Sequence, residues 1–331
     1  MSNILELKNI SKRFTKKLDL AGKFAAKLGS RAREETVHAV DDVSINIARG
    51  EVVGLVGESG CGKSTLGRVV VGIHPQTEGE RWWHGREVAV MSAAEKRTMQ
   101  LQVQMIFQDP YASLNPRYRD EDIIGEAPVV HGLVNSKDKA DYVASLMQKV
   151  GLDAALSKRF PHQFSGGQRA RIGIARALAV KPEFLVCDEA VAALDVSIQA
   201  QVLNLFIELR KEFNLTYLFI SHDLGVVKHL SDRVVIMYLG RVVEIGATDQ
   251  LFANANHPYT QALLAEVPQL DVRKKDFVAI KGEIPSPLNP PTGCHFHPRC
   301  PHAMARCSVE QPVLREIAPL RFSACHLNDM K

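Results

Sequence analysis

A glycine-rich segment that begins at Gly57 carries the residue types needed to bind phosphate. Residues 57–64 read GESGCGKS and fit G-x-x-x-x-G-K-[ST] at every fixed position. Glycines lack a Cβ, so backbone N–H groups can close around phosphate oxygens, and a helix starting here adds partial positive charge. Lys63 would reach the β- and γ-phosphates of a nucleotide, and the Ser64 hydroxyl would bind Mg²⁺. The residues assigned to this nucleotide site are Gly57, Glu58, Ser59, Gly60, Cys61, Gly62, Lys63, Ser64 and Thr65.

Two carboxylates follow a second apolar run. Residues 184–187 are apolar, and Asp188 and Glu189 come directly after them. Asp188 can hold Mg²⁺ through water, while Glu189 can orient or deprotonate an attacking water. The pair therefore predicts hydrolysis at the bound phosphates.

A parallel sheet is needed to bring these groups together. Residues 51–56, 184–187 and 216–220 have the pattern of strands buried on both faces, and His222 follows the last of them. All the polar groups fall at strand carboxyl ends, where open α/β sheets bind ligands. Further strands are predicted at residues 2–14, 36–49, 79–90, 103–107 and 234–238, with a hairpin to 245.

Length, charge and hydropathy limit the class of protein. The 331 residues suffice for one large domain with an appendage or for two domains, and the net charge of +4 is too mild to indicate nucleic acid. No stretch of 18 uncharged apolar residues occurs, and the charged start is unlike a signal peptide, so we expect a cytoplasmic chain. Residues 15–35 predict an exposed basic insertion, helical in part, which is a solvated face rather than a contact for phospholipid or nucleic acid.

Taken together and in order, the motifs resemble those of the ATP-binding-cassette (ABC) ATPases. The set comprises residues 57–64, Gln108, 164–168 (FSGGQ), 185–189, 193–195 (ALD) and 221–223 (SHD). Residues 108–117, 257–264 and 282–291 further resemble the ATPase subunits of oligopeptide and dipeptide importers, in particular the second such subunit of bacterial dipeptide permeases.

The resemblance implies a fold and a division of the chain. The fold would be an α/β P-loop NTPase core of the RecA-like type, with an antiparallel β subdomain and a helical subdomain at about 109–180. Residues 1–250 would form the cassette, and residues 251–331 a small Cys- and Pro-rich extension.

Roles for single residues also follow from the resemblance. Glu189 would be the catalytic base, Gln108 would link metal and water to the membrane subunits, and His222 would contact the γ-phosphate. Phe14 would stack on adenine, although a packed aromatic at a strand end is the alternative. The residues Ser165, Gly166, Gly167 and Gln168 would bind the nucleotide of the opposite subunit, and Asp195 belongs to the same composite site.

The implied function is ATP hydrolysis that drives peptide uptake. The chain would pair with an identical or paralogous ATPase and dock on two transmembrane permease subunits at the cytoplasmic face of the inner membrane. An extracytoplasmic solute-binding protein would take part indirectly, and no nucleic acid is expected. Rival interpretations are a cassette protein acting on ribosomes or DNA and a small-molecule kinase; nickel, glutathione and opine-like solutes are alternative cargoes.

Two positions depart from the family pattern. Ala190 stands where proline is usual, and Ala192 where serine is usual. The first change would loosen the turn after Glu189, and the second removes a polar contact at the dimer seam. Neither position touches phosphate or metal, so hydrolysis is still expected.

Cysteines mark two further segments of interest, the phosphate loop and the C-terminal region. Cys61, beside Lys63 in the phosphate loop, is predicted to have a stabilised thiolate. The alternative, which we favour for catalysis, is that this thiol is a small filler with no chemical part. Cys294, Cys300, Cys307 and Cys325 are separated by five, six and seventeen residues, gaps too wide for paired C-x₂-C zinc knuckles. A structural [4Fe–4S] cluster tolerates such spacing, and some related importer ATPases carry one. The alternatives are zinc with His295, His297, His302 or His326, and four reduced thiols.

Overall fold

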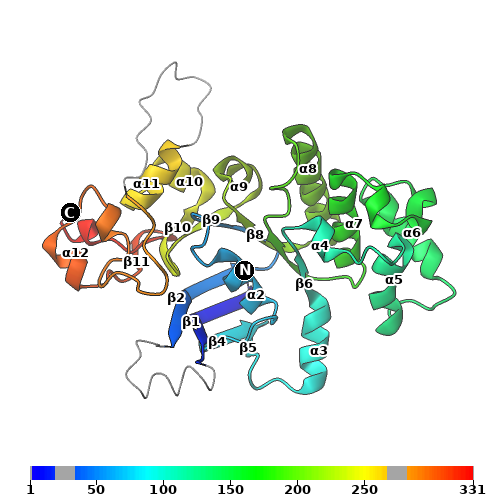
Figure 1. Cartoon of the computed structure of the whole chain (residues 1–331), viewed down its shortest axis with the longest axis horizontal. Helices are drawn as coiled ribbons and strands as arrows, with labels where there is room; N and C mark the ends of the chain where they lie inside the picture. The colour runs from blue at the N-terminus through cyan, green and yellow to red at the C-terminus, as the bar shows by residue number, and fades with distance from the viewer. Residues whose placement is uncertain (1, 19–33, 267–281, 331) are drawn as a thin grey trace.

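The computed structural model describes residues 2–18, 34–266 and 282–330 (Figure 1). Most of the basic insertion predicted at residues 15–35 therefore lies outside the described residues. Within them the chain forms two sheets with helices on both sides of the larger one. The helices α4 to α7 lie at one end of the molecule, and the C-terminal residues lie at the other (Figure 1).

The larger sheet has eight strands in the order β11-β12-β10-β9-β3-β8-β7-β6. Its parallel part consists of β3 (Val52–Val56), β6 (Val103–Ile106), β7 (Phe184–Asp188), β8 (Thr216–Ser221) and β9 (Arg233–Tyr238). The antiparallel part consists of β10 (Arg241–Ala247), β11 (Arg315–Ala318) and β12 (Arg321–Ser323). The strands predicted from buried apolar runs are confirmed.

The smaller sheet is antiparallel and has the order β2-β1-β4-β5. Its strands are β1 (Asn3–Lys16), β2 (Glu35–Ala48), β4 (Glu78–Trp83) and β5 (Arg86–Glu87). Ile10 and Ile47 from this sheet share one buried cluster with Leu66 and Val69 of α2 (Lys63–Val70) and with Leu55 of β3. Helix α2 is therefore enclosed between the two sheets, which fixes the direction of its N-terminus.

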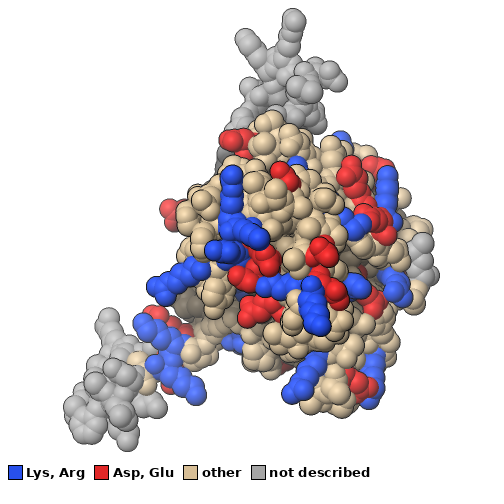
Figure 2. Space-filling model, turned by 90° about the vertical axis from the view of Figure 1, so that its right-hand side faces the viewer, with Lys and Arg blue, Asp and Glu red and all other residues tan. Residues whose placement is uncertain are grey.

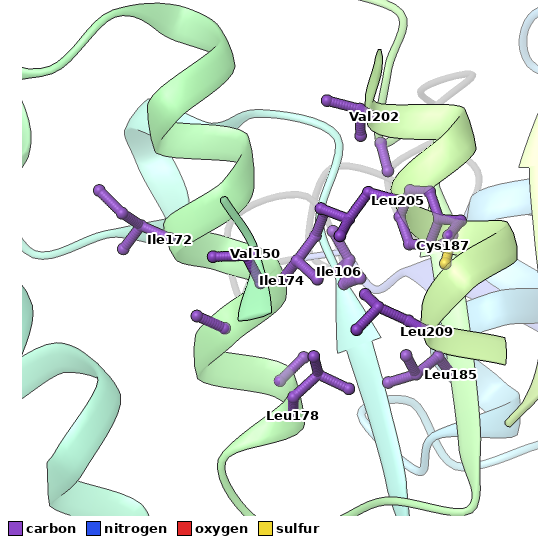
Figure 3. Packing of buried hydrophobic residues seen from close by; sticks show 14 of the residues in the cluster. Ile106, Val150, Ile172, Ile174, Leu178, Leu185, Cys187, Val202, Leu205 and Leu209 are labelled. Atoms are coloured by element: carbon purple, nitrogen blue, oxygen red, sulfur yellow. The ribbon is translucent and has the colours of Figure 1, made fainter. Parts of the chain in front are cut away.

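The other helices cover the remaining faces. They are α3 (Ala93–Gln102), α4 (Pro110–Ser113), α5 (Asp120–Val130), α6 (Lys139–Lys149), α7 (Gly166–Leu178), α8 (Val196–Phe213), α9 (Leu224–Leu230), α10 (Thr248–Ala253), α11 (Pro258–Ala265) and α12 (Ala305–Val309). Figure 3 shows Ile174 of α7 and Leu205 of α8 packing toward Ile106 of β6, so the helical segment shares a core with the sheet. On the face that carries α5 to α7, basic and acidic side chains are interspersed (Figure 2).

The C-terminal residues join the main sheet through β12, which pairs with β10 at Glu244–Ser323 and Ile245–Phe322. The Glu244 carboxylate is fully buried there and accepts hydrogen bonds from the amides of Asn256 and His257. The sequence analysis did not predict this strand, because residues 321–323 are too few to show a period.

Asp120, at the start of α5, is fully buried, and neither carboxylate oxygen has a hydrogen-bond partner within the described residues. Burial raises its pKa to about 7. An acid whose folded pKa lies above its unfolded value stabilises the fold at low pH, and that contribution is lost as pH rises from about 4 toward 7. Asp120→Asn should therefore raise the free energy of unfolding at pH 8, by up to a few kcal/mol at about 1.4 kcal/mol per pKa unit.

Urea unfolding at pH 5.5 and pH 8 measures this effect. The wild type should lose stability between the two values, and Asp120→Asn should lose much less. Glu126→Gln, which changes an exposed acid of the same helix, is the control and should follow the wild type. Equal pH dependence in wild type and Asp120→Asn would show that the carboxyl is not the cause.

Candidate active site

The carboxyl ends of three neighbouring strands meet at one edge of the main sheet. Val56 of β3 is in register with Ser221 of β8, and Asp188 of β7 is in register with Ile220. The loops that leave these strands therefore lie side by side. They carry the glycine-rich segment, Glu189 and His222, as the sequence predicted.

The phosphate loop closes tightly against the sheet and then turns into α2. Gly62, just before the helix, has φ 104°, and a Cβ at this position would lie 2.0 Å from the carbonyl oxygen of Ala39. Only glycine fits there. The Lys63 ammonium is buried and donates to the carbonyl oxygens of Gly57 at 2.6 Å and Glu58 at 2.9 Å.

The predicted magnesium ligands Ser64 and Asp188 are adjacent. The Ser64 hydroxyl donates a hydrogen bond to Asp188 Oδ1 at 2.8 Å. Burial raises the pKa of Asp188, while this hydrogen bond and nearby cationic side chains oppose the shift. Hydroxyl and carboxylate oxygens are ligands that Mg²⁺ accepts, so the donor set fits the ion. Among the described residues, no group of three or more His, Cys, Asp or Glu side chains is placed to hold a metal ion, either at this edge of the sheet or at the C-terminal cysteines.

Glu189 lies between two of the predicted partners. Gln108 Nε2 donates to Glu189 Oε2 at 2.6 Å, and His222 Nδ1 lies 3.3 Å from Glu189 Oε1. The Glu189 backbone has φ 46°, a left-handed conformation that costs a non-glycine residue energy and occurs often at functional sites. Its amide donates to the Ile220 carbonyl of β8 at 3.0 Å, which ties the strained residue to the sheet.

A cavity of about 340 Å³ opens over the phosphate loop. It is lined by Phe14, Val37, Ala39, Ser59, Gly60, Gly62, Lys63, Ser64, Thr65, Gln108, Glu189 and Pro287. Nine of the sequence-predicted residues thus line one space, while Gly57, Glu58, Cys61, Asp188 and His222 lie outside its lining. Phe14, 38% exposed, lines the cavity rather than packing in the core.

The FSGGQ residues do not line this cavity. Ser165 caps α7, accepting from the Gln168 amide at 3.3 Å, and the Gln168 side chain accepts from the Ser165 amide at 3.0 Å. A Cβ at Gly167 would lie 2.5 Å from Ile198 of α8. Asp195, just before α8, is likewise outside the cavity lining. The capped turn is therefore formed, but its residues are not among those that line the cavity over the chain's own phosphate loop.

The sequence analysis missed five contributors to the site. Val37, Ala39 and Pro287 line the cavity. Tyr259 and Arg299 form hydrogen bonds with Glu58 of the phosphate loop. Val37 and Ala39 looked like ordinary strand residues. Nothing in the linear sequence links positions 259, 287 and 299 with the loop, because only the fold brings them within reach.

The prediction of a stabilised thiolate at Cys61 is wrong. The side chain is only 4% exposed, and burial raises its pKa; the charge of Lys63 opposes the shift without overcoming it. The helix N-terminus lies beside the thiol, yet desolvation dominates.

Alkylation of Cys61 should nevertheless block nucleotide binding, since any added group must displace the loop above it. Labelling should be slow because the thiol is buried and protonated, and bound ATP should slow it further. Peptide mass spectrometry of protein treated with iodoacetamide with and without ATP measures this. Labelling of Cys61 that ATP leaves unchanged would contradict the phosphate position.

The four C-terminal cysteines surround one small cavity. Cys294, Cys300, Cys307 and Cys325 line it together with His257, His297, His302 and His326. The open space is about 10 Å³, room for about one water molecule. Burial raises the pKa of Cys294 to about 11 and also raises the pKa values of Cys300 and Cys325. None of the six cysteines, all of which lie within the described residues, forms a disulfide.

The parallel sheet, the phosphate loop and the paired carboxylates define a P-loop nucleoside triphosphatase. Residues 40–192 match the ABC transporter family, and residues 243–307 match the oligopeptide/dipeptide transporter C-terminal region. The oligopeptide transport ATP-binding protein AppF of Bacillus subtilis (strain 168) is 48% identical over 328 residues, which cover 98% of this chain and 97% of that protein. The chain belongs to the ABC transporter ATP-binding proteins that carry this C-terminal region.

Further relatives and solved structures are also ABC transporter proteins. The dipeptide transport ATP-binding protein DppF of Haemophilus influenzae is 46% identical over 91% of this chain and 93% of its own length. Among solved structures, cbiO1 of Clostridium perfringens, part of the ABC transporter complex cbiONQ, has a TM-score of 0.62 at 26% identity and covers 77% of this chain and 92% of its own. The cassette MJ0796, solved as a dimer with ADP and Pi, has a TM-score of 0.62 at 25% identity, over 74% of this chain and 98% of its own.

No helix among the described residues has both the length and the apolar content needed to cross a membrane.

Proposed function

We propose that this chain is the ATP-hydrolysing subunit of a bacterial ABC importer for peptides. The observation that carries the proposal is Glu189, held between Gln108 and His222 at the edge of the cavity over the phosphate loop. Relatives with nearly full coverage are named for oligopeptide and dipeptide transport, which supports peptides as the cargo.

The residues of the cavity divide the work of hydrolysis. Lys63 and the loop amides bind the phosphates, and Phe14 stacks on the base. Ser64 and Asp188 would hold Mg²⁺, which would supply charge neutralisation at the phosphates. Glu189 accepts a proton from the attacking water, since a carboxylate has about four lone-pair positions and its contacts with Gln108 and His222 leave some free.

Two cassettes are needed to complete each site. The Ser165 turn opens a helix, where amides suit an anion, and it lies outside the lining of the chain's own cavity. We infer that Ser165, Gly166, Gly167, Gln168 and Asp195 serve the nucleotide of a second ATPase subunit. ATP then joins the two subunits, and hydrolysis releases them, because open and closed dimers differ in their γ-phosphate contacts.

The remaining partners follow from this cycle. Closing of the ATPase dimer is transmitted to two membrane permease subunits through the Gln108 region and the helical segment at about 109–180. A solute-binding protein delivers the cargo on the outer side of the membrane. The chain therefore works at the cytoplasmic face of the inner membrane, as a peripheral subunit. Within it, residues 1–250 act as the cassette and residues 251–331 as the C-terminal extension.

Affinity purification from the source bacterium tests this assignment. The tagged chain should co-purify with polytopic permease subunits and a second ATPase from detergent-solubilised membranes. Recovery with ribosomes or DNA instead, and without permeases, would contradict it.

We further propose that the four C-terminal cysteines hold a structural [4Fe–4S] cluster, with zinc as the alternative. The support is that four thiols, soft ligands suited to iron–sulfur clusters, line one cavity. Because that space now admits about one water molecule, a cluster would have to push the thiols apart. Burial keeps the thiols of Cys294, Cys300 and Cys325 protonated, so binding would release protons and depend on pH.

Iron analysis of protein purified without oxygen checks this prediction. The preparation should be brown, absorb broadly near ~400 nm and contain about four irons per chain. Cys300→Ser should lose the iron, while the control Cys61→Ser, which changes a thiol outside the group, should keep it. Zinc in place of iron would select the alternative. Colourless folded protein with neither metal and four freely titratable thiols would overturn both.

A further inference from the structure

Glu58 in the phosphate loop is held by an arginine from the far end of the chain. Arg299 Nη1 donates to Glu58 Oε2 at 2.7 Å, and Nη2 donates to Oε1 at 2.9 Å. The Arg299 side chain is 5% exposed. A two-pronged, largely buried pair of this kind is both strong and geometrically specific. The second residue of the phosphate-binding motif is therefore fixed from outside the cassette.

The backbone of Glu58 is held as well. Its amide donates to the hydroxyl oxygen of Tyr259 at 2.9 Å, and its carbonyl oxygen accepts from Lys63 Nζ at 2.9 Å. Tyr259 is fully buried in α11 and packs against Tyr238 and Phe296. Glu58 thus joins the residue expected to bind phosphate, Lys63, to two residues of the C-terminal extension.

A third contact of the extension lies at the cavity itself. Pro287, also in the extension, lines the cavity together with Phe14, and its carbonyl oxygen accepts from the His38 amide at 3.0 Å. That hydrogen bond attaches the segment to β2. The extension therefore contacts the site at two places. One is Glu58 of the phosphate loop, and the other is the part of the cavity lined by Phe14, the ring proposed to stack on the base.

We propose that the C-terminal extension is part of the nucleotide site, with Arg299 and Tyr259 as positioning residues that fix the phosphate loop through Glu58 and with Pro287 as a wall at the base end. This inference rests on the proposed function, since it assumes that the cavity binds ATP. It makes nucleotide affinity depend on whether the extension is folded in place.

Coupling of this kind is reciprocal. If Arg299 raises the affinity of the loop for ATP, then ATP must stabilise the segment that carries Arg299 by the same factor. Cys300 is the next residue and lines the four-cysteine cavity. A change that unfolds that segment would withdraw the guanidinium from Glu58 and weaken nucleotide binding, although neither Arg299 nor Cys300 lines the cavity over the phosphate loop.

A double-mutant cycle on the full-length chain tests the proposal. A fluorescent ATP analogue is titrated into wild type, Glu58→Ala, Arg299→Ala and the double variant. Each single variant should bind about tenfold more weakly or worse, and the double variant should be no weaker than the singles, because both remove one interaction. Tyr259→Phe, which keeps the packing and removes only the hydroxyl, should also weaken binding.

Arg306→Ala is the matched control, because Arg306 lies in the same extension but pairs with Glu310 and Asp329 instead of the loop. It should bind the analogue as the wild type does. Additive effects in the cycle, or unchanged affinity in Arg299→Ala and Tyr259→Phe, would overturn the inference while leaving the proposed function standing. Failure of the wild type itself to bind the analogue would instead overturn the proposed function.

Hydrogen exchange supplies a second measurement, whose result would not depend on ATP if Arg299 had a purely structural role. ATP should slow amide exchange in residues 293–310 of the wild type and of Arg306→Ala, and should have little effect in Arg299→Ala. If ATP leaves exchange in this segment unchanged in the wild type, the coupling does not exist and the inference fails.

Discussion

Glu189→Gln should bind ATP as the wild type does and turn it over about 10²- to 10⁴-fold more slowly. The substitution keeps the size of the side chain and its contacts to Gln108 and His222 but removes the charge that accepts the proton. Since binding persists and hydrolysis stops, the variant should also trap the closed dimer with its partner subunit. Phosphate release by the assembled transporter and size-exclusion chromatography with ATP measure the two effects.

Glu208→Gln provides the control, because Glu208 is an exposed glutamate of α8 and does not line the cavity. It should hydrolyse ATP at the wild-type rate. Wild-type turnover in Glu189→Gln would remove Glu189 as the base and leave Gln108 or His222 to be reconsidered.

Lys63→Ala should lose most of the affinity for ATP. The ammonium is buried, and its loss leaves the phosphates without their nearest cation and the carbonyl oxygens of Gly57 and Glu58 without a donor. Removing one partner of a buried charged pair costs about 2 kcal/mol or more of binding free energy, which makes the dissociation constant roughly 30-fold larger. Titration with a fluorescent ATP analogue measures it.

Lys211→Ala, which removes an exposed lysine of α8, should leave the dissociation constant unchanged. The thermal midpoint of Lys63→Ala without nucleotide shows whether the loop still folds. A folded Lys63→Ala that binds ATP with wild-type affinity would contradict the assigned phosphate site.

The parts of the site that could be predicted from the sequence are those in which neighbours along the chain do the work. The phosphate loop and the Asp188-Glu189 pair each combine a buried strand with polar residues at its end, so a short pattern contains both the element and the chemistry. Their meeting at one sheet edge followed from the general geometry of parallel strands, and the register of β3, β7 and β8 confirms it.

The parts that could not be predicted depend on long-range contacts. Arg299 lies 241 positions from Glu58, and no local pattern marks an arginine that will meet a phosphate loop. Strand β12 has three residues, too few to alternate visibly, and is held by its pairing with β10 and β11. Cys61 was misjudged for a related reason, because burial under the loop, which is a tertiary property, outweighs the adjacent lysine.

Peptide uptake in the source bacterium tests the central claim most directly. Deleting the coding sequence should abolish ATP-dependent accumulation of labelled di- or oligopeptides that this system carries, with uptake of an unrelated amino acid unchanged. Wild type supplied in trans should restore accumulation, and Glu189→Gln should not. Undiminished uptake across a panel of labelled di- and oligopeptides after deletion, or full restoration by Glu189→Gln, would contradict the account of this chain as the ATP-hydrolysing subunit of a peptide importer.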